Sequence, residues 1–179
     1  MTFDPNRPQA PHPYEGLPAV PSFLLTSPQI TEGERLPYEL SDDGGAHSPE
    51  LNWRDAPAET KSFLITCFDP DAPRPGGFWH WLLVDVPTCC TGLPYDAGRH
   101  LNGDVASAYS TINSRGDYKY VGAAPPAGDQ LHRYFFAVHA LDVTHLQLPL
   151  GTKTSPVDVA FTALPHTIAR AVLMGGYQR

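Results

Sequence analysis

Several acidic, imidazole and hydroxyl side chains stand where apolar runs meet loops rich in glycine and proline. Imidazoles, hydroxyls and the backbone amides of such turns donate hydrogen bonds, and they suit the oxygens of a phosphate or carboxylate. Loop backbone at the end of a strand can also approach a ligand closely. The set therefore predicts a site for a small anion. Its members are Asp69, Asp71, His80, Tyr120, His132, Arg133 and Tyr134.

The two aspartates conflict with this prediction, because a carboxylate repels an anion. The conflict is resolved if the carboxylates accept hydrogen bonds from loop amides, or if they hold the imidazoles protonated, which raises the pKa of each histidine. The sequence then predicts a pre-organised anion site whose affinity depends on pH.

Other functions are possible for the same residue types. Aspartates and histidines can bind a divalent cation, so a metal-dependent or other hydrolase remains an alternative. However, their spacing matches no dedicated metal motif, and the sequence contains no Gly-x-Ser-x-Gly elbow, P-loop or HExxH. Purely structural explanations also exist: Asp-Pro opens turns, histidines pack in cores, and Arg133 can pair with an acid. We expect a non-enzymatic binding protein with no catalytic residue, metal ligand or cofactor.

The stretch from Ser62 to Pro87 must position most of these side chains. Two apolar runs flank an acidic loop with prolines and glycines, which predicts two strands in the middle of a sheet, covered on both faces. Continuing the alternation of the first strand through the turn places Asp69 and Asp71 on the same side. His80 can then approach them across the hairpin.

A third run, residues 131–141, supplies the remaining candidates. Its alternation places His132 and Tyr134 on one face of a strand and Arg133 on the other. The loop before it contains Pro125, and its prolines and glycines predict a sharp reversal that lets the backbone approach a ligand.

The rest of the chain predicts short strands and a helical C-terminus. A helix is expected over 157–163 with Ser155 as its N-cap, and a second helix over 168–174 that stops at Gly175-Gly176. The weakly patterned stretch 88–116 is expected to be a long connection. Short strands are expected at 23–25, 36–40, 51–54 and 117–121.

Composition limits the class of protein. A chain of 179 residues that is 41% hydrophobic suits one domain, here residues 22–179, after a proline-rich arm at residues 1–21. The net charge of −7 argues against nucleic acid or an anionic membrane as a partner. The sequence has no apolar stretch of a transmembrane segment and no secretion leader, so we expect a cytoplasmic protein. Its three cysteines form no disulfide framework.

The ordered set of motifs resembles the phosphatidylethanolamine-binding protein family, in particular its bacterial Raf-kinase-inhibitor-like branch. The resemblance covers about residues 22–177, nearly the whole domain. The motifs that carry it are Ser48-Pro49-x-Leu51-x-Trp53, Asp69-Pro70-Asp71-Ala72-Pro73, His80 before an apolar strand, Pro125-Pro126-x-Gly128 and His132-Arg133-Tyr134.

This resemblance implies an all-β fold, an antiparallel Greek-key β-sandwich with a short helical C-terminal segment and an anion pocket at one end. It implies binding of phosphate, a carboxylate or a phospholipid headgroup, a regulatory role toward a protein kinase or protease, and a homodimer. An inhibitor protein with a vestigial pocket is a second hypothesis. One departure, Ala123-Ala124 before the prolines, leaves the ligand open. The implied pocket residues are Asp69, Asp71, His80, His132 and Tyr134, with Tyr120 and Pro125 as its wall.

Overall fold

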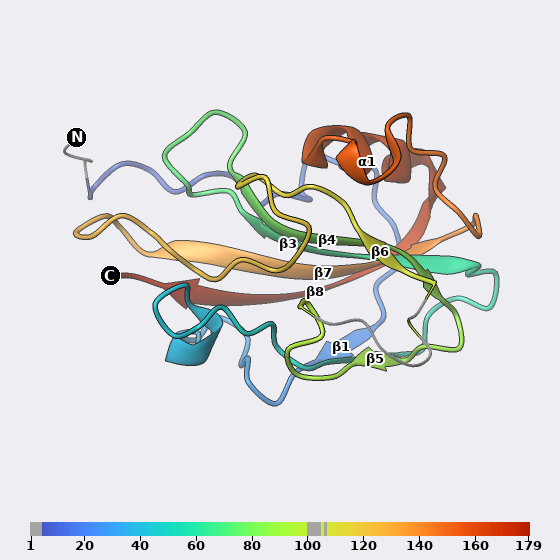
Figure 1. Ribbon diagram of the computed structural model, residues 1–179, viewed down its shortest axis with the longest axis horizontal. Helices are drawn as coiled ribbons and strands as arrows, with labels where there is room; N and C mark the ends of the chain where they lie inside the picture. Colours follow the sequence, from blue (N-terminus) through green and yellow to red (C-terminus); the bar gives the residue numbers. More distant parts are fainter. Residues whose placement is uncertain (1–4, 100–104, 106) are drawn as a thin grey trace.

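The computed structural model describes residues 5–99, 105 and 107–179, which form two antiparallel sheets and one short α-helix (Figure 1). The larger sheet has the strand order β6-β4-β3-β7-β8, and the smaller sheet has the order β1-β2-β5. The strands are β1 (Leu24–Thr26), β2 (Leu51–Arg54), β3 (Ser62–Asp69), β4 (Phe78–Pro87), β5 (Gly92–Leu93), β6 (Tyr109–Ser110), β7 (His132–Leu141) and β8 (Thr167–Tyr177). The helices are α1 (Pro156–Ala163) and the 3-10 turns η1 (Tyr38–Leu40), η3 (Gly151–Lys153) and η4 (Leu164–His166).

The predicted hairpin forms the centre of the larger sheet. β3 pairs with β4 along one edge and with β7 along the other, and both pairings are antiparallel. Among the four strands β3, β4, β6 and β7, the last in sequence, β7, returns to lie beside the first, β3, as in a Greek key. The predicted fold class is therefore confirmed.

Two apolar clusters lie on opposite faces of the larger sheet. The inner face packs against the smaller sheet and includes Trp81 and Phe136. The outer face packs against α1 and includes Leu64, Leu82 and Val159. Figure 1 shows α1 on one side of the larger sheet and strands β1 and β5 on the other. Because both faces are covered, the two central strands are apolar on both sides.

The helix predicted over 157–163 is confirmed as α1, but the second helix predicted over 168–174 is wrong because this segment is strand β8. Every second side chain, those of Ala169, Ala171 and Leu173, is buried in the inner cluster. This burial in a strand outweighs the preference of alanine for a helix. Gly175 does not end a helix. A Cβ atom there would lie 2.3 Å from Cδ2 of Leu36, so a larger residue would displace the buried Leu36 side chain.

Neither 36–40 nor 117–121 forms the expected strand. Part of the first is the 3-10 turn η1, which follows Pro37, a residue without an amide hydrogen for a ladder. The second follows a loop closed by Asn113, whose Oδ1 accepts hydrogen bonds from three successive amides at 115–117. The long connection 88–116 contains the short strands β5 and β6, and its residues 100–104 and 106 lie outside the described residues.

The described part of the proline-rich arm, residues 5–21, contains no helix or strand and is held against the larger sheet by hydrogen bonds. The Arg7 guanidinium donates to the Asp71 carbonyl oxygen at 2.7 Å, and the Ala10 amide donates to the Asp71 carboxylate at 2.9 Å. At the end of the arm the Arg170 amide in β8 donates to the Pro21 carbonyl at 2.9 Å. Separately, no helix among the described residues has the length and hydropathy needed to cross a lipid bilayer.

Candidate functional site

A pocket of about 260 Å³ lies at the end of the larger sheet where β3 ends and β4 and β7 begin. It brings together four of the predicted site residues: Asp69, His80, His132 and Tyr134. They meet because the antiparallel register places these strand ends side by side. The remaining lining residues are Ala72, Pro73, Arg74, Phe78, Arg115, Ala124 and Pro126.

His132 lies between two carboxylates and is buried. Its Nδ1 is 2.7 Å from Oδ2 of Asp69, and its Nε2 is 3.0 Å from Oδ2 of Asp129. Burial opposes a charge on the ring, but the hydrogen bonds and negative charges of the two carboxylates outweigh it and raise the pKa of His132. Since both ring nitrogens face carboxylate oxygens, the imidazolium form satisfies both contacts.

The negative charges of Asp69 and Asp129 are thereby balanced. Asp69 accepts the Asp71 amide at 2.8 Å through its other oxygen, an aspartate turn that ends β3. Asp129 forms an ion pair with Arg7 of the arm, and this hydrogen bond, together with that from His132, lowers the pKa of Asp129 to about 2 against the effect of burial. The carboxylate charges beside the pocket are therefore balanced by cations.

His80 differs from His132 in its charge state. Its Nδ1 lies 2.8 Å from the carbonyl oxygen of Val121, so this nitrogen carries the hydrogen and donates it. Burial lowers the pKa of His80 although the charge of Asp69 opposes this shift. The expected upward shift of the imidazole pKa is therefore found for His132 but not for His80, whose pKa is lowered.

Tyr134 lies edge-on to the His80 ring, with 5.1 Å between ring centroids. Its side chain is fully buried, and its hydroxyl has no hydrogen-bond partner of good geometry among the described residues. Burial raises the pKa of Tyr134 well above its ordinary value, so the hydroxyl keeps its hydrogen. The pocket thus contains a hydroxyl donor for which the described residues offer no acceptor of good geometry, which is rare for a buried polar group.

Asp71 is not part of this pocket. Its carboxylate faces the outer side of β7, where the Arg133 guanidinium donates to both oxygens at 2.8 and 2.9 Å. The predicted alternation through the turn is wrong because β3 ends at Asp69, after which the chain turns. Arg133 pairs with an acid, as predicted if its role is purely structural.

Two further predicted residues lie away from the pocket lining. Tyr120 is buried in the inner cluster, and its hydroxyl donates to the Leu40 carbonyl oxygen at 2.9 Å. Pro125 does not line the pocket, whereas its neighbours Ala124 and Pro126 do. The proline loop therefore lines the pocket, but through adjacent residues.

Sequence reasoning missed four charged residues around the pocket. Arg74 and Arg115 line its opening, and Arg115 also pairs with Asp42 at 2.8 Å. Asp129 carries a weak signal in the sequence, since it stands three residues before His132 at the end of the proline loop. Arg7 carries none, because its contact joins segments 122 residues apart.

A metal-dependent or other hydrolase needs a histidine nitrogen with an available lone pair, which His80 keeps at Nε2 and His132 does not. Both nitrogens of His132 are directed at carboxylates, so neither offers a lone pair to a metal or accepts a proton from a nucleophile. Among the described residues, no group of three or more His, Cys, Asp and Glu side chains is arranged to hold a metal ion.

The fold and the pocket define a class: a two-sheet β protein with a histidine- and aspartate-lined pocket at one end of its larger sheet. A family model described as phosphatidylethanolamine-binding protein matches residues 26–178. The chain therefore belongs to the phosphatidylethanolamine-binding protein family.

Within this family the chain belongs to the bacterial YbhB and YbcL branch. YbhB of Escherichia coli K12 is 40% identical over 155 residues, which cover 82% of this chain and 94% of YbhB. The crystal structure of E. coli YbcL superimposes with a TM-score of 0.82 at 36% identity and covers 88% of this chain and 99% of that one. A homologue from Chlamydia trachomatis has a TM-score of 0.72 at 29% identity, covering 88% of this chain and 98% of that one.

Proposed function

We propose that this chain is a non-enzymatic protein that binds the anionic group of a small ligand, such as a phosphate ester, in the pocket formed by Asp69, His80, His132 and Tyr134. The observation that carries the proposal is the buried Tyr134 hydroxyl, which has no partner of good geometry among the described residues. An oxyanion at this point would accept its hydrogen bond.

The charges around the pocket support an anion rather than a cation. The charges of Asp69 and Asp129 are compensated by His132 and Arg7, and Arg74 adds positive charge to the lining, whereas the charge of Arg115 is balanced by Asp42. His80 holds its Nδ1 hydrogen on Val121, so its Nε2 becomes a donor only after protonation. Anion binding is therefore expected to be coupled to proton uptake by His80.

The wider role rests on the family alone. The family's name supports phosphoethanolamine, the headgroup of phosphatidylethanolamine, as one ligand to test. A regulatory or inhibitory role toward a protein kinase or protease, assembly as a homodimer and a cytoplasmic location are part of this proposal, by likeness and composition. If the pocket is vestigial instead, a His80→Ala, His132→Ala variant will keep all partner binding.

A histidine NMR titration tests the proposal. Phosphate and phosphoethanolamine are added separately to the 15N-labelled protein, and the His80 signals are assigned with a His80→Gln variant. We expect His80 to shift saturably with either ligand. His166 serves as the control in the same spectrum, since it lies near the opposite end of the sheet, beside the start of β8. An unchanged His80 at millimolar ligand would contradict anion binding.

A further inference from the structure

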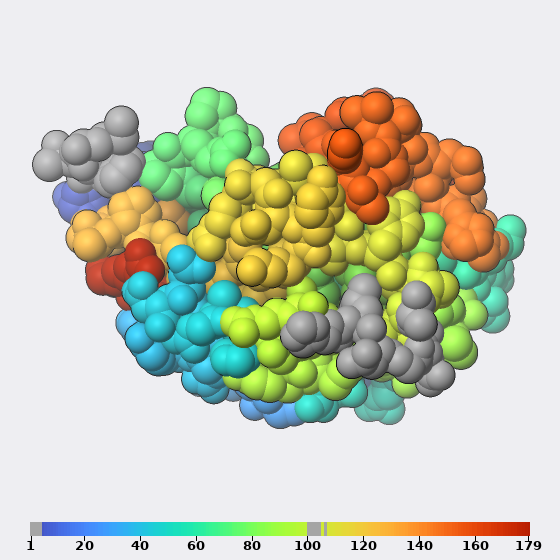
Figure 2. Space-filling model, in the orientation of Figure 1, coloured from blue at the N-terminus to red at the C-terminus, as the bar shows by residue number. Residues whose placement is uncertain are grey.

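A second, larger pocket lies on the outer face of the larger sheet. It has a volume of about 680 Å³, within the ~300–1,000 Å³ typical of small-molecule sites. Its walls are residues 10–14, 16 and 17 of the arm, the outer faces of β3 and β4, the loop 70–77 and α1. Figure 2 shows the surface hollowed between this loop and α1. The anion pocket lies toward the inner face of the sheet, and Arg74 in the loop 70–77 borders both pockets.

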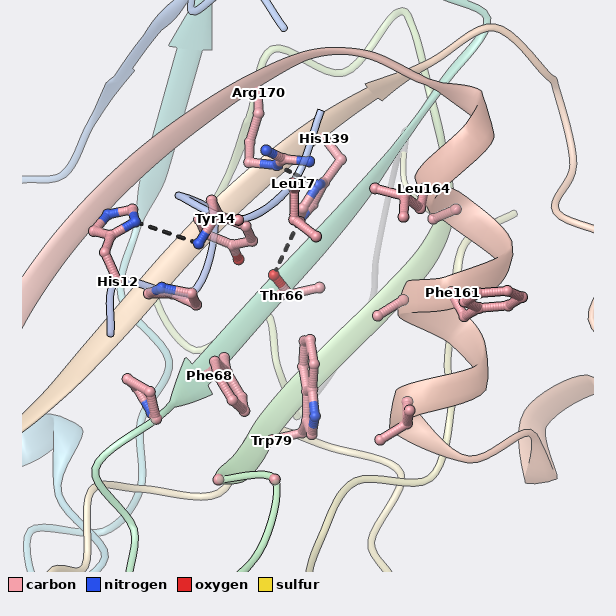
Figure 3. A pocket seen from close by; sticks show the side chains of 18 of the residues that line it. His12, Tyr14, Leu17, Thr66, Phe68, Trp79, His139, Phe161, Leu164 and Arg170 are labelled. Atoms are coloured by element: carbon pink, nitrogen blue, oxygen red, sulfur yellow. Dashed lines mark hydrogen bonds between the residues drawn. The ribbon is translucent and has the colours of Figure 1, made fainter. Parts of the chain in front are cut away.

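Most of the lining is apolar. The sheet contributes Leu64, Phe68 and Trp79, and the helical segment contributes Ala160 and Leu164. At the rim the side chains of Val157 and Phe161 are exposed. Figure 3 shows Phe68 and Trp79 at one end of the pocket and Leu164 on the side of the helix. The lining therefore suits a hydrocarbon chain.

The other end of the pocket is polar and cationic. Arg170 in β8 is buried, with 8% of its surface exposed, and its Nε donates to Nδ1 of His139 at 3.1 Å. The guanidinium also lies over the Tyr14 ring, with 4.5 Å to the ring centroid. Figure 3 shows these three side chains together, with Thr66 beside them. Neither Nη nitrogen has a hydrogen-bond partner among the described residues.

No negative charge balances this guanidinium within the described lining. None of the described residues that line the pocket is an aspartate or a glutamate, although the chain carries 19 of them. His139 adds no second positive charge, since burial lowers its pKa to about 3 and keeps the imidazole neutral. Burial likewise lowers the pKa of Arg170. A buried cation without a counter-ion costs free energy, and a bound anion would lower this cost.

An unused donor lies at the same end. The Tyr14 hydroxyl is buried and has no hydrogen-bond partner of good geometry among the described residues. Burial raises the pKa of Tyr14 to about 12, so the hydroxyl keeps its hydrogen. In Figure 3 it is directed toward Thr66 in the middle of the pocket. The Arg170 guanidinium and the Tyr14 hydroxyl, whose polar neighbour is Thr66, therefore flank one point of a mostly apolar pocket, and Arg74 lines its other end.

We propose that this pocket binds an amphiphile with a single carboxylate head and an unbranched hydrocarbon chain. The two Nη nitrogens of Arg170 are the end-on pair that can donate to both oxygens of a carboxylate, and Tyr14 supplies a further hydrogen bond. The hydrocarbon chain of the ligand then extends past Phe68 and Trp79 toward the rim. The proposed head-group contacts, Arg170 and Tyr14, do not line the anion pocket, although Arg74 borders both pockets, so this proposal does not rest on the proposed function.

Calorimetric titration with dodecanoate, below its micelle concentration, tests the proposal, with dodecanol and dodecyltrimethylammonium as matched neutral and cationic chains. We expect one saturable dodecanoate site, with dodecanol about tenfold weaker or more because it lacks the charge-assisted hydrogen bonds. Amide NMR signals of Tyr14 and Arg170 and the Trp79 indole signal should shift, while His80 should not. Equal affinity for all three amphiphiles, or shifts confined to His80 and His132, would overturn the proposal.

Variants test the contacts to the carboxylate head of the ligand separately from those to its hydrocarbon chain. Arg170→Gln should weaken dodecanoate about tenfold and leave dodecanol unchanged, while Arg170→Lys should restore part of the loss. The control is Arg54→Gln, which removes an equal charge from an exposed position in the smaller sheet. Ala160→Trp fills the pocket from the helix and should abolish binding of both amphiphiles.

Thermal unfolding of each variant checks that it is folded. If Arg170→Gln does not fold, the Ala160→Trp result and the NMR map decide the proposal. A wild-type chain that binds no amphiphile, and whose oligomeric state changes in Ala160→Trp, would overturn it and assign this face to contact between copies.

Discussion

Asp69 and Asp71 stand two positions apart, are both buried, and lie on opposite faces of the larger sheet with different partners. Asp69 faces inward and contacts His132 at 2.7 Å, a partner whose charge depends on a proton. Asp71 faces outward and contacts Arg133 at 2.8 Å, a partner that is always charged. One carboxylate therefore belongs to a pH-sensitive cluster, and the other anchors the arm permanently.

The partners also decide what each carboxylate can do. Burial would raise the pKa of Asp71, but the Arg133 guanidinium and the amides of Ala10 and Arg133 outweigh burial and lower it. Its oxygens are fully occupied, so its role is structural. On the inner face, the Tyr134 hydroxyl has no acceptor of good geometry among the described residues, and His80 gains a donor at Nε2 when it is protonated. Identical side chains therefore differ in function according to whether the groups around them keep hydrogen-bonding capacity for a ligand.

The largest effect is expected on the outer face, where Arg133→Ala removes the counter-ion of Asp71 and leaves a buried carboxylate. The free energy of unfolding at neutral pH should fall by about 3 kcal/mol, as for other broken buried pairs. Urea denaturation measures it. Arg54→Ala, at an exposed site, is the control and should change stability by no more than about 0.5 kcal/mol. A loss below about 1 kcal/mol for Arg133→Ala would show that water replaces the guanidinium and that the arm is not anchored here.

On the inner face, His132→Asn should lower the free energy of unfolding by about 2 kcal/mol near neutral pH, since two charge-assisted hydrogen bonds are lost. It should also change the pH dependence. Because folding raises the pKa of His132, its stabilisation is complete below the unfolded value of about 6.5 and is lost as the pH rises through the folded value.

Urea titrations at a series of pH values measure this difference. The wild-type chain should lose stability on the alkaline side of about pH 6.5, and His132→Asn should lack that loss. Arg133→Lys, which changes the outer face, should keep the wild-type slope. If the slope is the same in wild type and His132→Asn, His132 is not the proton-dependent partner and the contrast between the two faces fails.

The smallest effect on stability is expected from Tyr134→Phe. The hydroxyl has no hydrogen bond of good geometry to lose among the described residues, so unfolding should change by less than about 0.5 kcal/mol. Phosphate affinity, measured by calorimetry, should nevertheless fall about fivefold to tenfold. A variant with unchanged affinity would remove Tyr134 from the proposed ligand contacts and leave the anion to His80 and the arginines.

Much of the fold could be predicted from local patterns. The central hairpin, the alternation of His132 and Tyr134 against Arg133, and the Ser155-capped helix all follow from periodicity and capping rules. β8 could not be predicted this way, because its alanines favour a helix locally. Only pairing with β7 and close contact between Gly175 and Leu36 impose the strand.

The site was predictable where strand register fixes a side chain and not where a turn or a distant segment does. Asp69 ends a strand and follows its alternation, while Asp71 lies past the strand end, where alternation no longer applies. Arg7 and Asp129 join segments far apart in the sequence, and no local pattern indicates such a pair. The pKa shifts of His80 and His132 in opposite directions likewise depend on burial and contacts formed only in the fold.

The proton coupling of the anion pocket is tested most directly by measuring the pKa of His80 by NMR without and with saturating sulfate, whose charge is constant between about pH 5 and pH 8. The structure indicates a His80 pKa below the ordinary value of about 6.5 in the free protein. Saturating sulfate should raise this pKa, and sulfate affinity should increase as the pH falls. An identical His80 pKa in both samples, with affinity independent of pH, would contradict the account.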